Sequence, residues 1–189
     1  MKSQDSSEII AFESARAWES WLAKHHTESS GVWLLIAKKG VDKALITIGE
    51  ALDVALCYGW IDSQRKGHDD ESYLQRYSPR RPKSPWSQLN VERVDALTKA
   101  KRMRARGLAE VAAARADGRW ESAYEGAATI AVPEDLAAAL AADPAAAASF
   151  AGLDGANRYA ILYRLHDAKR PETRARRLGT PRNLNHLCR

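Results

Sequence analysis

Residues 47–62 read TIGEALDVALCYGWID, and this stretch predicts how the chain passes from a helix into a strand. Thr47 and Glu50 have the spacing of a capping box, in which each side chain accepts a hydrogen bond from the backbone amide of the other residue. The apolar residues that follow have helical spacing, and Gly59 can end the helix because glycine adopts the left-handed conformation without strain. We therefore predict a helix between Thr47 and Gly59 and a strand that starts directly at Trp60.

Four short segments have the composition of strands and predict one small sheet. Residues 31–39, GVWLLIAKK, are rich in β-branched and aromatic residues and should be buried at their centre. Residues 79–85 should form a loop, because each proline lacks an amide donor and biases the preceding residue away from the helical region. The four predicted strands are residues 8–12, 31–39, 60–65 and 72–78.

Helical periodicity dominates the rest of the chain. Ser14 is a candidate N-cap for a helix that buries two tryptophans, and His25 on the same face is expected to lie at the edge of the core. Further helices are predicted near 91–97, 108–118, 133–153 (a short Ala-rich pair), 157–168 and 171–187. The fold class is therefore α+β, with a small sheet covered by helices in residues 1–118 and an all-helical part in residues 119–189.

Composition and charge restrict the class of protein. Among 189 residues, 45% are hydrophobic and 28% are charged, which is typical of a globular protein rather than a disordered or membrane protein. The net charge of +5 favours anionic partners. The segment MKSQDSSEII lacks the apolar core of a secretion signal, so a cytoplasmic location is expected. Cys57 and Cys188 match no metal-ligand spacing and are expected to be reduced thiols.

Residues 58–90 are the predicted binding region, because they combine aromatic, basic and small polar side chains with few aliphatic ones. Guanidinium groups bind phosphate or carboxylate in pairs of hydrogen bonds, hydroxyl groups complete such a shell, and the amides at the start of the next helix add affinity for anions. The alternative is a solvated loop fixed to the domain by Trp86. The candidate residues are Asp62, Ser63, Tyr73, Arg76, Arg80, Arg81, Lys83, Ser84, Trp86, Ser87 and Asn90.

Asp62 is a weak candidate for a catalytic base. A lone aspartate among many arginines usually has its charged form favoured, which lowers its pKa and suits an orienting role better. Trp60 is expected to be buried between the helix and the strand, whereas Trp86, in a proline-rich loop, is expected to be more exposed.

Several function classes lack their motifs in this sequence, including phosphate-binding loops, dinucleotide-binding glycine patterns, GxSxG hydrolases and HExxH metalloproteases. No metal ligand set and no cofactor are predicted. Two basic runs, residues 99–106 and 169–177, leave open non-specific binding of nucleic acid. An enzyme that acts on a phosphorylated or carboxylated small molecule is the other alternative.

Eight blocks in order resemble the YdeI/OmpD-associated family of bacteriocin-protection proteins: WESWLAKHH, GVWLLIAKK, EALDVALCYGWIDS, YSPRRPKSPWSQLN, RMRARGL, GRWESAY, PEDLAAAL and AKRPETRARRLGT. The resemblance extends over nearly the whole chain and is strongest at residues 55–62, 79–90 and 168–174, whereas residues 180–189 depart from the pattern. It implies an α+β N-terminal part, a helical C-terminal part, a role in stress or antimicrobial-peptide resistance, and association with an outer-membrane porin. It supplies no reaction and no catalytic residues. The expected function is therefore cytoplasmic protection through binding of an anionic small ligand or protein partner by residues 60–90.

Overall fold

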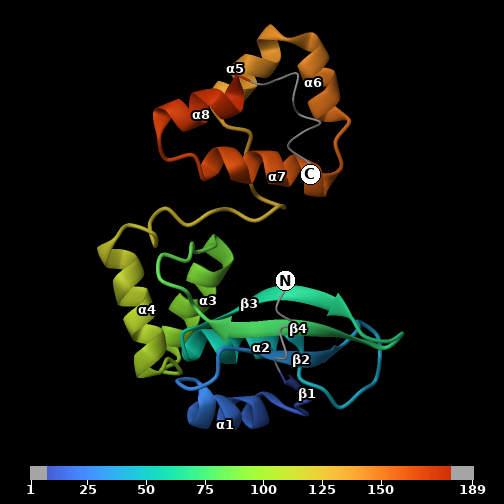
Figure 1. The fold of residues 1–189 in the computed structure, drawn as a ribbon, viewed down its shortest axis with the longest axis vertical. Helices are drawn as coiled ribbons and strands as arrows, with labels where there is room; N and C mark the ends of the chain where they lie inside the picture. The colour runs from blue at the N-terminus through green and yellow to red at the C-terminus, as the bar shows by residue number, and fades with distance from the viewer. Residues whose placement is uncertain (1–7, 180–189) are drawn as a thin grey trace, which may run out of the picture. The chain divides into compact units, whose positions relative to one another are not determined.

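The computed structural model describes residues 8–179, and its N-terminal part is built on a four-stranded mixed sheet (Figure 1). The strands stand in the order β1-β2-β4-β3; β1 runs parallel to β2, and the other two neighbouring pairs are antiparallel. The predicted α+β fold with a helical C-terminal part is confirmed. The strands are β1 (Ile9–Ile10), β2 (Val32–Ala37), β3 (Trp60–Gly67) and β4 (Ser72–Pro79).

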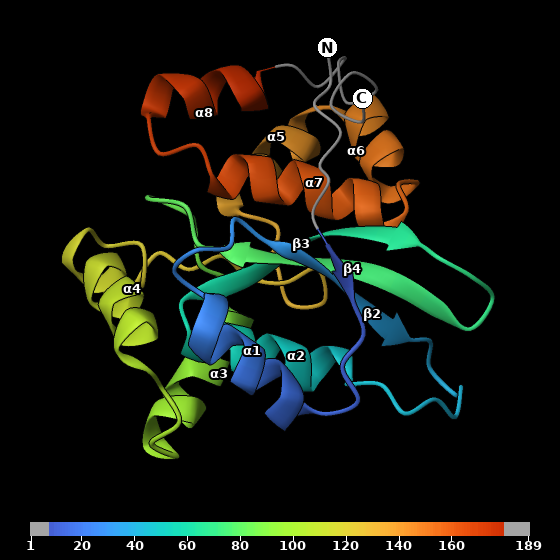
Figure 2. The ribbon, with the colours of Figure 1, turned by 60° about the horizontal axis from the view of Figure 1, so that its bottom comes forward.

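Helices α1 (Ala15–His25) and α2 (Ile48–Cys57) lie against one face of this sheet (Figure 2). Both predicted N-caps are confirmed. The Ser14 hydroxyl accepts a hydrogen bond from the Ala17 amide at 3.3 Å. At α2 the capping box is complete, because the Glu50 amide donates to Thr47 Oγ1 at 3.2 Å and the Thr47 amide donates to Glu50 Oε2 at 3.1 Å. Local signals in the sequence thus determine where both helices begin.

The core between sheet and helices is rich in tryptophan. Trp18 and Trp60 are both fully buried, with ring centroids 6.2 Å apart, so the predicted burial of Trp60 is confirmed. Each indole N–H is satisfied by a backbone carbonyl, Trp18 by that of Ala51 at 3.1 Å and Trp60 by that of His26 at 3.2 Å. These bonds remove the cost of burying a polar atom, and the rings tie α1 to α2 and to the sheet.

Two further helices, α3 (Gln88–Lys99) and α4 (Ala105–Ala116), complete the first part of the chain. Helix α4 packs closely on the end of α2 at Gly107, where an added Cβ would lie 2.3 Å from the Cys57 carbonyl oxygen. That carbonyl also accepts a hydrogen bond from the Arg104 amide at 3.0 Å. Burial raises the pKa of the Cys57 thiol to about 11, so this thiol stays protonated at neutral pH.

The C-terminal region forms its own core from four helices: α5 (Glu134–Ala142), α6 (Pro144–Ala151), α7 (Gly155–His166) and α8 (Pro171–Leu178). Leu136, Phe150 and Leu162 are among the side chains buried in it. Asp143 caps α6 and Pro144 occupies its first turn, within the predicted Ala-rich pair of helices at 133–153. The predicted helix over 171–187 is described as far as Leu178, and Cys188 lies outside the described residues.

Arg174 joins three of these helices. Its Nε and Nη2 donate to the two carboxylate oxygens of Asp135 on α5, at 2.5 and 2.8 Å, and its Nη1 donates to the Leu165 carbonyl on α7 at 2.8 Å. The arginine of the AKRPETR block is therefore a structural residue of the helical region.

The chain divides into two compact units. The first contains the sheet, α1, α2, α4 and most of α3, up to Ala123; the second contains Ser87–Leu89 and the chain from Tyr124 onward. Among residues 8–179, no helix is both long enough and apolar enough to cross a membrane.

Candidate functional site

A bulge in β3 determines which of the predicted site residues share a face of the sheet. Asp62 pairs with Tyr77 and Arg65 pairs with Gln75, so two residues of β3 stand opposite the single Arg76 of β4. Residues three apart on a regular strand point to opposite faces, and the extra residue cancels that alternation. Asp62 and Arg65 consequently face the same side as Tyr77, the side that the helices cover.

Asp62 is half-buried, and its electrostatics differ from the prediction. Burial raises the pKa of its carboxyl group above the ordinary value, and a hydrogen bond to its own backbone amide, with the guanidinium groups of Arg80, Arg65 and Arg93, opposes this only in part. The predicted lowering of the Asp62 pKa was wrong, because sequence reasoning counted the neighbouring charges and could not count the loss of water. Burial, together with the charge of Asp62, also raises the pKa of the Tyr77 hydroxyl.

Buried polar atoms near Asp62 lack partners within the described part of the chain. They are the Tyr77 hydroxyl and Nε of Arg93, whose Nη1 donates to Asp53 at 2.6 Å. Buried donors of this kind are usually satisfied by ordered water or by a ligand. A carboxyl group with a raised pKa beside a phenol could take part in proton transfer.

Arg80 and Trp86 form a stacked pair inside the loop that follows β4. The Arg80 guanidinium carbon lies 3.5 Å from the centroid of the Trp86 ring, and its Nη1 donates to the Pro85 carbonyl at 3.2 Å. The Trp120 ring packs on Trp86 with centroids 4.9 Å apart. Only 2% of Trp86 is exposed, so the predicted exposure of this ring was wrong.

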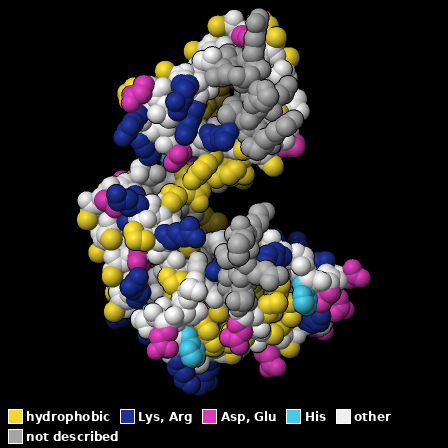
Figure 3. Space-filling view, in the orientation of Figure 1, with side chains coloured by type: hydrophobic (Ala, Val, Ile, Leu, Met, Phe, Trp, Pro, Cys, Tyr) yellow, Lys and Arg dark blue, Asp and Glu magenta, His cyan; other side chains and the backbone are white. Residues whose placement is uncertain are grey.

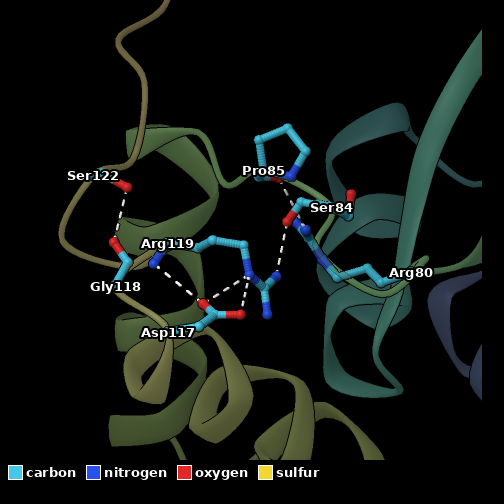
Figure 4. Close-up of polar contacts among 7 residues, drawn as sticks. All are labelled: Arg80, Ser84, Pro85, Asp117, Gly118, Arg119 and Ser122. Atoms are coloured by element: carbon cyan, nitrogen blue, oxygen red, sulfur yellow. Dashed lines mark hydrogen bonds and ion pairs between the residues drawn. The ribbon is translucent and has the colours of Figure 1, made fainter. Parts of the chain in front are cut away.

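Arg119 fixes the same loop from outside (Figure 4). Its Nη1 donates to the Ser84 carbonyl at 2.9 Å, and its Nε donates to both Asp117 oxygens at 2.8 Å. Arg81 and Lys83, which the sequence placed in an anion shell, are exposed. At residues 80–86 the structure therefore favours the alternative, a loop fixed to the domain by Trp86, over a group of side chains that binds an anion.

The remaining candidates are dispersed. Arg76 is adjacent to Tyr77 on β4 and therefore projects from the opposite face, where its guanidinium carbon lies 5.9 Å from the Trp33 ring centroid. Ser63 is exposed. Ser87 belongs to the second compact unit, and Asn90 lies buried in the first turn of α3 rather than before it. Among the predicted site residues, Asp62 and Arg80 lie close enough for the Arg80 charge to lower the pKa of Asp62.

A cavity of about 790 Å³ opens at the end of the sheet where the β2–α2 loop faces the β3–β4 hairpin. Figures 1 and 2 both show this loop and the hairpin turn at the same end of the sheet. None of the described residues that line the cavity is acidic. We call it the basic cavity; its basic lining residues are Lys38, Lys39, Lys43, Arg65 and Lys66, and its apolar ones are Ala37, Val41, Leu45, Ile46, Ile48 and the Tyr73 ring.

The basic groups of the cavity are not equivalent. Arg65 lies over the Tyr73 ring at 4.3 Å from its centroid, and its Nε donates to Gln75 Oε1 at 3.2 Å, which fixes the guanidinium group. The Lys66 ammonium lies 4.1 Å from the Trp33 ring centroid on the other face, so it is directed away. Of the other cations, Lys38, Lys39 and Arg65 line the cavity, and Lys43 lines it while paired with an acidic residue at its edge.

Acidic residues lie next to the cavity at the hairpin turn. Lys43 forms an ion pair with Glu71 at 2.7 Å, and Asp69 accepts hydrogen bonds from the Ser72 hydroxyl and two backbone amides. The Ser72 hydroxyl is the main cause that lowers the pKa of Asp69 to about 2. Figure 3 shows acidic side chains gathered over this tip, with basic ones beside them. The tip is the turn between the third and fourth predicted strands, residues 60–65 and 72–78.

Sequence analysis found only part of this cavity. Arg65 and Tyr73 lie in the predicted binding region, whereas Lys38 and Lys39 fall at the end of the predicted strand 31–39 and Lys43 has no predicted role. What these three lysines share in the sequence is their place in a lysine-rich loop directly before the capped helix α2. Nothing local in the sequence indicates that this loop faces the hairpin.

The two basic runs are partly used in ion pairs within the protein. Arg104 contacts Glu19 at 2.5 Å, Arg106 contacts Glu110 at 3.4 Å, and Arg174 binds Asp135. Within residues 8–179, no group of three or more His, Cys, Asp or Glu side chains is placed to hold a metal ion.

Comparison with known proteins gives two family matches. A family model described as a Domain of unknown function (DUF8412) matches residues 10–110, and one described as Bacteriocin-protection, YdeI or OmpD-Associated matches residues 129–180. No curated protein and no solved structure matches. The predicted resemblance is confirmed in the helical region, whereas the blocks at 55–62 and 79–90 fall within the first match.

Proposed function

This chain belongs to the family of the domain of unknown function that matches residues 10–110, and carries a bacteriocin-protection, YdeI or OmpD-associated domain at residues 129–180. From this premise we propose that it is a cytoplasmic protection protein that binds a small anionic molecule in the basic cavity. The proposal keeps the expected anionic ligand but locates its binding at the Arg65 end of residues 60–90, away from the loop at 80–86.

The observation that supports the proposal is the fixed position of Arg65 at the wall of the cavity. Its Nε is engaged by Gln75 and its face by Tyr73, which leaves the two terminal nitrogens for a carboxylate or phosphate group. A guanidinium group held in this way loses little side-chain entropy when it binds. The cavity volume of about 790 Å³ is within the range of small-molecule sites, about 300–1,000 Å³.

The test is a thermal-shift screen of anions on three proteins. A ligand at a hundred times its dissociation constant adds about 2.7 kcal/mol of stability, so the wild type should show a higher Tm with some carboxylates or phosphates. Arg65→Gln should lose most of that shift. Arg81→Gln is the matched control, because it removes the same charge from an exposed residue outside the cavity. Equal shifts in all three proteins would contradict the proposal.

An enzyme acting on a phosphorylated or carboxylated small molecule is a second candidate. It is favoured by the raised pKa of Asp62 beside the buried Tyr77 hydroxyl, since a carboxyl group tuned upward is better suited to proton transfer near neutral pH. Its test is turnover of a metabolite mixture, followed by mass spectrometry. Conversion by the wild type and not by Asp62→Asn would support it, whereas no conversion, or equal conversion by both proteins, would exclude this role for Asp62.

A further inference from the structure

We propose that the ligand of the basic cavity is an amphiphilic anion, a molecule with one acidic head group and an aliphatic body. This inference rests on the proposed function, and it adds the chemistry of the part of the ligand that carries no charge. The head group is assigned to Arg65, and the body to the aliphatic wall that the β2–α2 loop and the start of α2 present.

The aliphatic wall is the first support for an apolar body. Ile46 is almost fully buried, Val41, Leu45 and Ile48 are half-buried, and all four line the cavity. Ile48 also packs against the main core of the first unit. A ligand that covered this wall would remove apolar surface from water, which is favourable in proportion to the area covered.

The scarcity of neutral polar groups is the second support. Among the neutral side chains that line the cavity, those of Thr47 and Tyr73 carry a polar group. Thr47 already serves the capping box, in which its hydroxyl lies 2.7 Å from Glu50 Oε2. The same box places a carboxylate at the start of α2, so this helix end does not attract an anion. A sugar or base would therefore find few neutral side-chain partners for its hydrogen-bonding groups.

Size is the third support. A water molecule takes about 30 Å³ in the liquid, so a cavity of about 790 Å³ is much larger than an inorganic anion requires. A bound phosphate alone would leave the aliphatic wall in contact with water. A medium-length alkyl chain attached to the acidic group would cover it.

The experiment is calorimetric titration of the full chain with butanoate, hexanoate, octanoate and decanoate, below their micelle concentrations. Each buried methylene should tighten binding by about fourfold until the body fills the wall. Decanol, which has the same body and no charge, should bind far more weakly than decanoate. Octyl phosphate, which carries another acidic head, should bind as octanoate does or more tightly.

Two variants distinguish the contribution of the acidic head group to binding from that of the aliphatic body. Arg65→Gln should weaken all four acids by a similar factor, because it removes the partner of the head group. Val41→Ser should weaken decanoate several-fold and leave butanoate unchanged, because it alters only the wall. Far-UV circular dichroism of each variant checks that the fold is intact.

Each outcome is decisive. Affinity that does not depend on chain length would overturn the amphiphilic body and leave the anion site standing. Equal affinity for decanol and decanoate would overturn the anionic head. Absence of binding by every acid and by octyl phosphate would overturn this inference, and the proposed function would fail as well if no anion in the thermal-shift screen bound.

Discussion

Replacing Gly107 with alanine should lower the free energy of unfolding of the first compact unit by about 1–3 kcal/mol. The added Cβ would lie 2.3 Å from the carbonyl oxygen of Cys57 and 2.8 Å from that of Leu56. Both obstacles are backbone atoms at the end of α2, so no rotation of a side chain can relieve the overlap. Helix α4 would have to move away and weaken the hydrogen bond from the Arg104 amide to Cys57.

Helix propensity alone would make Gly107→Ala more stable, so a loss of stability can be explained only by the overlap. Alanine is favoured over glycine inside a helix by about 1 kcal/mol, so without the overlap Gly107→Ala would be stabilising. Gly49→Ala is the matched control, because Gly49 lies in α2 and an added Cβ there meets nothing within 4 Å. That variant should be neutral or more stable by up to about 1 kcal/mol.

Urea unfolding followed by tryptophan fluorescence is the assay. All six tryptophans lie between Trp18 and Trp120, within the first unit, so fluorescence reports on that unit and circular dichroism reports on both. Equal or greater stability of Gly107→Ala, relative to wild type, would refute the close packing of α4 on α2.

Four other substitutions test the described contacts. Trp60→Ala and Trp86→Ala should each lower the free energy of unfolding by about 3–5 kcal/mol, because both rings are buried. Urea unfolding followed by circular dichroism measures this. A loss below about 1 kcal/mol for Trp86→Ala would show that its stacking with Arg80 is not maintained. Asp62→Asn should raise the Tm at pH 7, because burial raises the pKa of Asp62 and its charged form therefore disfavours the folded state. The difference in Tm between variant and wild type should shrink as the pH falls through the pKa of Asp62 in the folded protein. A lower Tm of the variant at pH 7 would contradict this prediction. Arg174→Ala should weaken the helical unit by about 1–2 kcal/mol in circular dichroism. Because Arg174 lowers the pKa of Asp135 below 3.8, the wild-type advantage should be complete above that pH and decline below it, and an advantage that persists unchanged at pH 2 would argue against the ion pair.

The sequence predicted the fold well because its signals are local. The capping box at Thr47, the Ser14 cap and the composition of four strands each lie within a few residues, and the structure confirms them. Even the join between α2 and β3 follows from a single residue, Gly59, which has a φ of +72°.

The site was predicted less well because it depends on contacts between distant segments. A proline-rich loop favours an exposed Trp86, but Trp120 packs on it from 34 positions further along the chain. The basic cavity requires the loop at 38–47 to face the hairpin at Arg65, and no local pattern carries that information. The pKa of Asp62 likewise depends on burial, which only the folded chain defines.

Lysine footprinting with octanoate tests the central claim, that an amphiphilic anion binds in the basic cavity, most directly. The chain is treated briefly with an acetylating reagent with and without the acid, and modification at each lysine is measured by mass spectrometry of peptides. We expect slower modification of Lys38, Lys39 and Lys43, and no change at the exposed Lys83, which lies outside the cavity. Unchanged rates at all four lysines, or equal protection of Lys83, would contradict the account.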